Sequence, residues 1–129
     1  MANIKKIFTE TFEADEDLSD YQYHGVTMSD DRKVDLQDAN TDIPCGILQN
    51  TPKDTQEAEV LVVGRTPIVA GETIAAGNQI RIDSNGHAMV FEVDTDTTTY
   101  CCGFCTVGAE VGEIIEAIVN CINPFKGEE

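Results

Sequence analysis

Residues 58–64 read AEVLVVG and carry the strongest strand signal in the chain. Valine is enriched in strands because its branched Cβ packs well on a pleated surface. The segment is bounded upstream by turn-forming residues, TPKDT at 51–55, and it continues downstream as RTPIVA at 65–70. We therefore predict a strand over residues 58–64 whose chain stays extended up to residue 70.

A short internal echo follows this strand. Residues 70–74 read AGETI and residues 76–80 read AGNQI, so each copy is Ala-Gly, two polar residues and Ile. The pattern predicts two consecutive tight bends, each followed by an inward-pointing isoleucine, Ile74 and Ile80. Residues 81–91 then predict a hairpin, because Asn85-Gly86 is among the strongest short hairpin signals.

Further strand-like segments lie on both sides of this region. Upstream they cover residues 25–28, 32–36 and 43–50, with a turn expected at 29–31. Downstream they cover residues 100–107 and 113–122. The last segment also fits a helical period, but its β-branched isoleucines favour a strand. Together these segments predict about eight to ten short strands, which is typical of an all-β fold: a small, compact β-barrel or β-sandwich.

The expected organisation has three parts. Residues 1–24 form an extended N-terminal arm with six acids and no base between Glu10 and Asp20. Such a charged run fits either a segment that orders on a partner or a frayed terminus. Residues 25–123 form the β-rich domain, and residues 124–129 form a C-terminal tail that begins at Pro124.

The charge balance excludes several classes of partner. The chain has 129 residues, 24 acidic and 8 basic side chains, and a formal net charge of −16. Nucleic-acid binding needs clustered Lys and Arg, and anionic membranes attract basic segments, so we expect neither partner. We find no segment typical of a signal peptide or a membrane span, which predicts synthesis in the cytoplasm of the producing cell.

The cysteines could in principle carry chemistry. They are Cys45, Cys101, Cys102, Cys105 and Cys121. Cys102 and Cys105 form a C-x-x-C pair, which could be half of a zinc site or a redox pair. Strand-like residues flank the pair and no second ligand pair has metal-site spacing, so we favour buried thiols in a strand. A thiol-dependent enzyme or metal protein using Cys101, Cys102 and Cys105 is the less favoured alternative.

The other polar residues do not form a catalytic motif. His24 and His87 occur without a nucleophile motif, a metalloprotease motif or a phosphate-binding loop. Residues 83–86, DSNG, resemble the start of a calcium-binding loop, but the later ligands of an EF-hand loop are missing. Asp94 and Asp96 fit solvated turn carboxylates. We therefore expect no enzymatic activity, no metal and no cofactor.

The order of turns and apolar positions resembles the capsid decoration, or capsid cement, proteins of tailed phages. It consists of IPCGILQNTP at 43–52, a strand ending at Gly64, the two Ala-Gly bends, the hairpin at 83–88, and Gly112-Glu113 before an apolar terminal strand. The resemblance covers about residues 25–122. It implies a β-rich homotrimer, made in the host cytoplasm, that binds the major capsid protein on the outer surface of the virion.

That resemblance identifies no capsid-binding residues by motif. Within the N-terminal arm, the apolar residues could anchor on the shell and the lysines could pair with capsid carboxylates. The predicted capsid-binding residues are accordingly Ile4, Lys5, Lys6, Ile7 and Phe8. The alternative function is a small β-clip-type domain that binds a carbohydrate or peptide ligand, since the two Ala-Gly bends also suit such domains.

Overall fold

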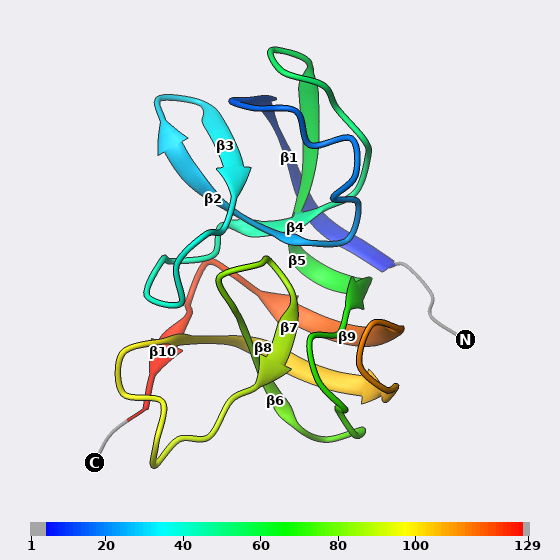
Figure 1. Cartoon of the computed structure of the whole chain (residues 1–129), viewed down its shortest axis with the longest axis vertical. Helices are drawn as coiled ribbons and strands as arrows, with labels where there is room; N and C mark the ends of the chain where they lie inside the picture. The colour runs from blue at the N-terminus through cyan, green and yellow to red at the C-terminus, as the bar shows by residue number, and fades with distance from the viewer. Residues whose placement is uncertain (1–4, 128–129) are drawn as a thin grey trace.

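The computed structural model describes residues 5–127, and within this range the chain forms ten strands and no helix (Figure 1). The predicted all-β fold class is confirmed. No helix that could cross a membrane occurs in the described part of the chain. The strands are β1 (Lys5–Ala14), β2 (Gly25–Asp30), β3 (Lys33–Leu36), β4 (Gly46–Leu48), β5 (Glu57–Val69), β6 (Gln79–Ile82), β7 (Ala88–Val90), β8 (Tyr100–Val107), β9 (Ile114–Asn120) and β10 (Phe125–Lys126).

The 13-residue strand β5 runs through the centre of the molecule. It contains the predicted AEVLVVG strand and extends to Val69, which confirms that prediction. Its first half pairs with β1 and β4, whereas its second half pairs with β9. Val60, Leu61 and Ile68 are fully buried, so β5 contributes to the core along its length.

The first half of the chain closes into a small barrel in the upper part of Figure 1. The hydrogen-bonded order is β1-β3-β2-β4-β5, and β1 pairs with β5 to complete the ring. Most of these pairs are antiparallel, but β1 and β3 pair in parallel at Glu13 and Ala14. Closure leaves no long free edge on which another chain could template a sheet.

The second half forms another curved sheet in the lower part of Figure 1, in the order β5-β9-β8-β6-β7. A bridge between Ala70, just after β5, and Ala88 of β7 brings the two ends of this sheet together. The short strand β10 pairs with β8. β5 is therefore a shared wall of both halves, and the buried apolar side chains form one continuous cluster.

The bends after β5 behave as the echo predicts. Ile74 and Ile80 are 2% and 0% exposed, which confirms that both point inward. The hairpin between β6 and β7 is also present, and Gly86 adopts a φ of 75° there. Asn85 does not share the positive φ, because the turn closes instead through a 3.1 Å hydrogen bond from Gly86 N to Asp83 O.

Two local predictions need correction, and a third is confirmed. The strand expected over residues 43–50 is ordered as a ladder only in β4, because Pro44 has no N–H to donate. The turn expected at residues 29–31 lies at 31–32, since β2 continues to Asp30. The segment at 113–122 is a strand and not a helix: β9 pairs with β5 over its whole length.

Residues 5–14 of the expected N-terminal arm form β1. The strand pairs with β5 from Lys5↔Arg65 to Glu13↔Glu57. Ala14 and Leu18, which both lie within the acidic run, are fully buried, so apolar anchors hold this segment on the barrel. The division of the chain at residues 24 and 123 stays a prediction.

Candidate interaction surfaces

The predicted capsid-binding residues lie at the start of β1. Ile4 lies outside the described residues, and of Lys5 only the backbone pairing with Arg65 is described. Lys6 forms a 2.7 Å ion pair with Glu59 of β5. Ile7 and Phe8 are 69% and 42% exposed, which is unusual for side chains of their size. Their role in binding a capsid stays a prediction.

A β-bulge explains why Ile7 stands out from the sheet. Lys6 pairs with Gly64 and Phe8 pairs with Val63, so Ile7 is an extra residue with no partner on β5. Gly64 has a φ of 146°, a conformation that side-chain-bearing residues rarely adopt. Bulges commonly redirect a side chain at a functional surface.

Ile7 belongs to a larger exposed row across four strands, which we name the Arg65 row: Ile7 of β1, Arg65 of β5, Ile118 of β9 and Phe104 of β8. The register places Arg65 opposite Ile118 and Ile118 opposite Phe104. Ile118 and Phe104 are 39% and 45% exposed. A hollow of about 260 Å³ lies beside Ile7, Arg65 and Ile118.

Arg65 is the only charged member of this row. Its Nε is buried and donates no hydrogen bond, and it forms no ion pair with any described residue. A buried donor without an acceptor costs free energy of about 1–3 kcal/mol. The Arg65 row therefore combines exposed apolar surface with a cationic group that lacks a partner, a combination that suits an acidic and apolar binding partner.

A second apolar surface lies at the waist of the molecule, and we name it the Met28 hollow. It holds about 400 Å³ and is lined by Thr27, Met28, Ile43, Pro44, Cys45 and Cys121. Met28 and Ile43 are 45% and 54% exposed on its rim. Asp30 and Asp42 flank these two residues in the sequence and form no ion pair with a described residue. The hollow is thus lined mainly by apolar side chains, and an acidic residue lies within two positions of Met28 and of Ile43 in the sequence.

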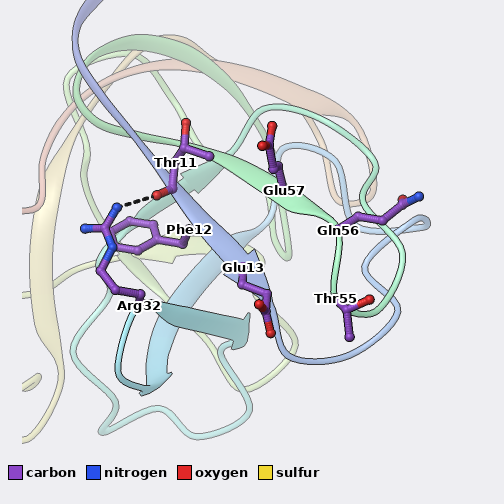
Figure 2. Close-up of a pocket in the computed structure, with 7 residues that line it drawn as sticks. All are labelled: Thr11, Phe12, Glu13, Arg32, Thr55, Gln56 and Glu57. Carbon is purple, nitrogen blue, oxygen red and sulfur yellow. Dashed lines mark hydrogen bonds between the residues drawn. The ribbon is translucent and has the colours of Figure 1, made fainter.

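A polar crease between β1 and the turn at residues 54–56 has a structural explanation (Figure 2). The guanidinium carbon of Arg32 lies 4.9 Å from the centroid of the Phe12 ring, and Arg32 donates a 2.7 Å hydrogen bond to the carbonyl of Thr11. Arg32 also lies 3.6 Å from Glu10. These contacts attach the β2–β3 turn to β1.

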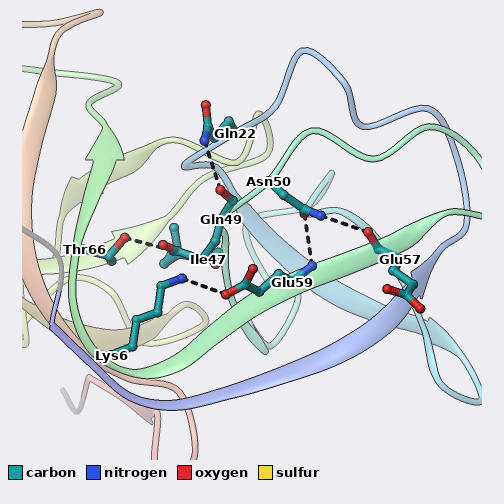
Figure 3. A network of polar contacts seen from close by, with 8 residues as sticks. All are labelled: Lys6, Gln22, Ile47, Gln49, Asn50, Glu57, Glu59 and Thr66. Carbon is teal, nitrogen blue, oxygen red and sulfur yellow. Dashed lines mark hydrogen bonds and ion pairs between the residues drawn. The ribbon is translucent and has the colours of Figure 1, made fainter.

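A polar network on the other side of β1 ties the loops to β5 (Figure 3). Asn50 accepts a 3.0 Å hydrogen bond from Glu59 N and donates one of 2.9 Å to Glu57 O. The buried Gln49 side chain donates a 2.9 Å hydrogen bond to Thr66 Oγ1. Gln22 in turn donates to Gln49 O. The network fixes the loop before β5.

The cysteines are arranged as buried apolar side chains. Cys101, Cys102 and Cys105 are 1–2% exposed in β8, which confirms the predicted placement. Burial raises the pKa of Cys45 to about 12 and also raises the pKa of Cys101 and Cys105. A hydrogen bond with Cys102, together with burial, raises the pKa of Cys121 well above its ordinary value. Thiols of this kind are poor nucleophiles at neutral pH because the thiolate is the reactive form.

The polar turn residues serve the local structure. Asp83 accepts hydrogen bonds from the backbone of Asn85 and His87 at 2.8 and 2.9 Å, which holds the hairpin turn. The ring centroids of His24 and His87 lie 5.0 Å apart, and burial lowers the pKa of His24. Within residues 5–127, no three His, Cys, Asp or Glu side chains are grouped to hold a metal ion.

Sequence reasoning missed Arg65, Ile118 and Phe104, which are remote from one another along the chain. One signal in the sequence pointed to β9. Ile114 and Ile118 occupy even-numbered positions and Ile115 and Val119 occupy odd-numbered ones, so a strand here places apolar side chains on both of its faces. Apolar residues at both parities indicate a strand with two covered faces. Ile115 and Val119 face the core, so Ile114 and Ile118 form an apolar outer face.

Comparison with known proteins finds a likeness of fold. No family model matches the chain, and no curated protein matches it. Among solved structures, the head fiber gp8.5 N base in bacteriophage phi29 superimposes with a TM-score of 0.64 at 17% sequence identity. The match covers 95% of this chain and 98% of the phage chain. The two chains therefore share a fold from end to end.

Proposed function

We propose that this protein is a structural component of a tailed-phage head. In this proposal it sits on the outer surface of the virion, binds the major capsid protein and stabilises the capsid lattice by bridging neighbouring subunits. The observation that carries the proposal is the fold shared with a phage head fiber base over almost the whole of both chains. The order of strands and Ala-Gly bends, which resembles capsid decoration proteins, supports it independently.

The chemistry of the molecule suits a structural role better than an enzymatic one. Four of the five thiols are buried, and the pKa values of Cys45, Cys101, Cys105 and Cys121 are raised. The hydrogen bonds that Asp83 accepts hold its own hairpin. The exposed apolar side chains instead offer contact surface. Non-enzymatic binding is therefore part of the proposal.

Bridging contacts would act through multivalency. A shell under internal pressure opens at the junctions between its subunits, so a protein that contacts several subunits raises the free energy needed to open them. A homotrimer, as the decoration-protein resemblance implies, would multiply modest affinities when all three sites engage together. The charge of −16 is compatible with a position outside the shell, away from the packaged genome.

Co-sedimentation with expanded empty heads tests the proposal. The heads come from the phage whose genome carries this gene, and we expect the wild-type protein to pellet with them at a saturable ratio. Absence of binding at every concentration would overturn the proposal. Phe8→Ser tests the predicted capsid-binding residues, with Val111→Ser as the control, because Val111 is 65% exposed in the turn before β9.

Point changes are preferable to deleting the start of the chain. Lys5, Lys6, Phe8 and Thr9 pair with β5, so their removal would take away part of the β1–β5 ladder of the first barrel. We expect Phe8→Ser to weaken head binding at least tenfold and Val111→Ser to leave it unchanged, since buried aromatic anchors dominate many interfaces. Equal binding by both variants would remove Phe8 from the contact.

A further inference from the structure

The Arg65 row and the Met28 hollow are complementary in chemistry. Arg65 is a cation without an ion pair among the described residues, and its Nε is buried without an acceptor. Asp30 and Asp42, beside the hollow, are likewise in none of the described ion pairs. Within residues 5–127 the Arg65 row thus has a cation without an acidic partner, and the Met28 hollow has acidic neighbours without a cationic partner. Acids outnumber bases in the chain by 24 to 8.

The two surfaces are also complementary in shape. Each has an apolar side chain that projects from a rim next to a hollow: Ile7 is 69% exposed beside a hollow of about 260 Å³. Ile43 is 54% exposed beside a hollow of about 400 Å³. Apolar side chains of this size fill such spaces, and their burial away from water is favourable.

One copy cannot bring its own two surfaces together, because they lie on opposite sides of the molecule. In Figure 1 the start of β1, which carries Ile7, lies on the right of the waist. The segment between β3 and β4, which carries Ile43, lies on the left. The end of β9 connects them: Ile118 faces outward, whereas Cys121 lines the Met28 hollow.

We propose that the Arg65 row of one copy docks on the Met28 hollow of a second copy, with Arg65 facing the carboxylates of Asp30 and Asp42. The contact is heterologous, so each copy uses one surface as donor and the other as acceptor, and a suitable rotation closes a ring. The row packed against itself in a two-fold dimer would instead bring Arg65 near Arg65 without an acid. The contact rests on the proposed function only in that it supplies the surfaces for the predicted homotrimer.

Sedimentation velocity of the purified protein tests this contact without a capsid. We expect the wild-type protein to form a closed oligomer, and Ile118→Lys and Ile43→Lys each to sediment as monomers. A lysine buried at either surface should weaken association by about 100-fold, equivalent to about 2.7 kcal/mol. Val111→Lys is the control and should assemble as the wild type does, while circular dichroism verifies the fold of every variant.

Mixing the two monomeric variants is the decisive step. Ile118→Lys keeps an intact Met28 hollow and Ile43→Lys keeps an intact Arg65 row, so an equimolar mixture should form a heterodimer through one wild-type contact. A mixture that stays monomeric would overturn the proposal, as would a monomeric wild-type protein or variants that assemble normally. If a lysine variant loses its fold, Ile118→Ser and Ile43→Ser replace the pair.

The same variants separate this contact from capsid attachment. Wild-type assembly without head binding would refute the proposed function and leave the copy–copy contact standing. Loss of head binding by Ile118→Lys with normal assembly would refute the contact and assign the Arg65 row to the capsid. Arg65→Glu adds a test of the charge pairing, and we expect it to dissociate the oligomer about as strongly as Ile118→Lys does.

Discussion

Gly103 of β8 lies directly against the backbone carbonyl of Ile118 in β9. A Cβ atom placed on Gly103 would overlap the carbonyl oxygen of Ile118 and would lie 2.9 Å from the Cα of Val119. The obstructing atoms are backbone, so they cannot move aside as the end of a flexible side chain could. The close approach of β8 to β9 therefore depends on the absence of a side chain at position 103.

Gly103→Ala should consequently destabilise the protein by about 1–3 kcal/mol, the usual cost of overpacking a tightly packed site. Chemical denaturation monitored by circular dichroism measures the change. Gly77→Ala is the matched control, because a Cβ there meets nothing within 4 Å although φ is 92°. We expect the control to cost about 1–2 kcal/mol through its backbone conformation alone; a Gly103 variant as stable as the wild type would contradict the packing argument.

The core-facing and outward-facing sides of the second curved sheet predict opposite responses to truncation. Ile80 is 0% exposed and Ile114 is 43% exposed. Ile80→Ala should lower the free energy of unfolding by about 2–5 kcal/mol, since it leaves a cavity in the core. Ile114→Ala should change that free energy by about 0.5 kcal/mol or less. Thermal and denaturant unfolding of both variants decide between these outcomes, and equal effects would show that the inward placement of Ile80 is mistaken.

Asp35 should make stability depend on pH. Partial burial, followed by repulsion from Glu16, Asp38, Asp15 and Asp42, raises its pKa from 3.8 to about 6. Between these two values the folded protein holds a proton that the unfolded chain has released, so the free energy of unfolding falls as pH rises from about 4 to about 6 and then levels off. Asp35→Asn should remove this decline and should stabilise the protein at neutral pH.

Denaturant unfolding of wild type and Asp35→Asn at several pH values between about 4 and 8 measures the effect. Asp17→Asn is a useful comparison, because hydrogen bonds from Ser19 lower the pKa of Asp17. Its contribution therefore has the opposite sign, being lost as pH falls. Identical pH profiles for wild type and Asp35→Asn would show that the carboxyl group of Asp35 is not responsible.

The thiols should be unreactive in the folded protein. Burial raises the pKa of Cys45 to about 12, and Cys101, Cys102, Cys105 and Cys121 are at most 8% exposed. We therefore expect a thiol reagent such as dithionitrobenzoate to react slowly with the native protein near neutral pH and rapidly in denaturant. Rapid stoichiometric labelling of one native cysteine would instead indicate a reactive thiol and reopen the alternative of thiol chemistry.

Local patterns in the sequence predicted the strands β2 to β9 in outline, but not β1 or the closure of the first barrel that β1 provides. The branched residues of β5, the Ala-Gly bends before Ile74 and Ile80, and the isoleucines of β9 each identify a strand or a bend from neighbouring residues. The parallel pairing of Glu13 with Lys33, which closes the first barrel, depends on how distant segments align. No local pattern specifies that alignment, because pairing partners in a barrel are chosen by tertiary packing.

The candidate surfaces were beyond prediction for a related reason. Ile7 could be recognised as apolar, yet its outward position results from the bulge opposite Gly64. Arg65, Ile118 and Phe104 become neighbours only through the register of β5, β9 and β8. In the sequence Phe104 lies 39 positions after Arg65 and Ile118 lies 14 positions after Phe104, and no local motif links them.

The central strand also sets an order of events during synthesis. All five strands of the first barrel precede Ala70, so this barrel has its complete hydrogen-bonded ring once the chain has emerged to that point. β9, the partner of the second half of β5, is made about 45 residues later, and domains generally begin folding from the N-terminus during translation. The strands of the first barrel are therefore all available for pairing before β9, whereas Val63–Val69 of β5 have no β9 to pair with until synthesis reaches residue 120. A ribosome stalled before β9 would hold a chain in which this part of β5 lacks its neighbouring strand.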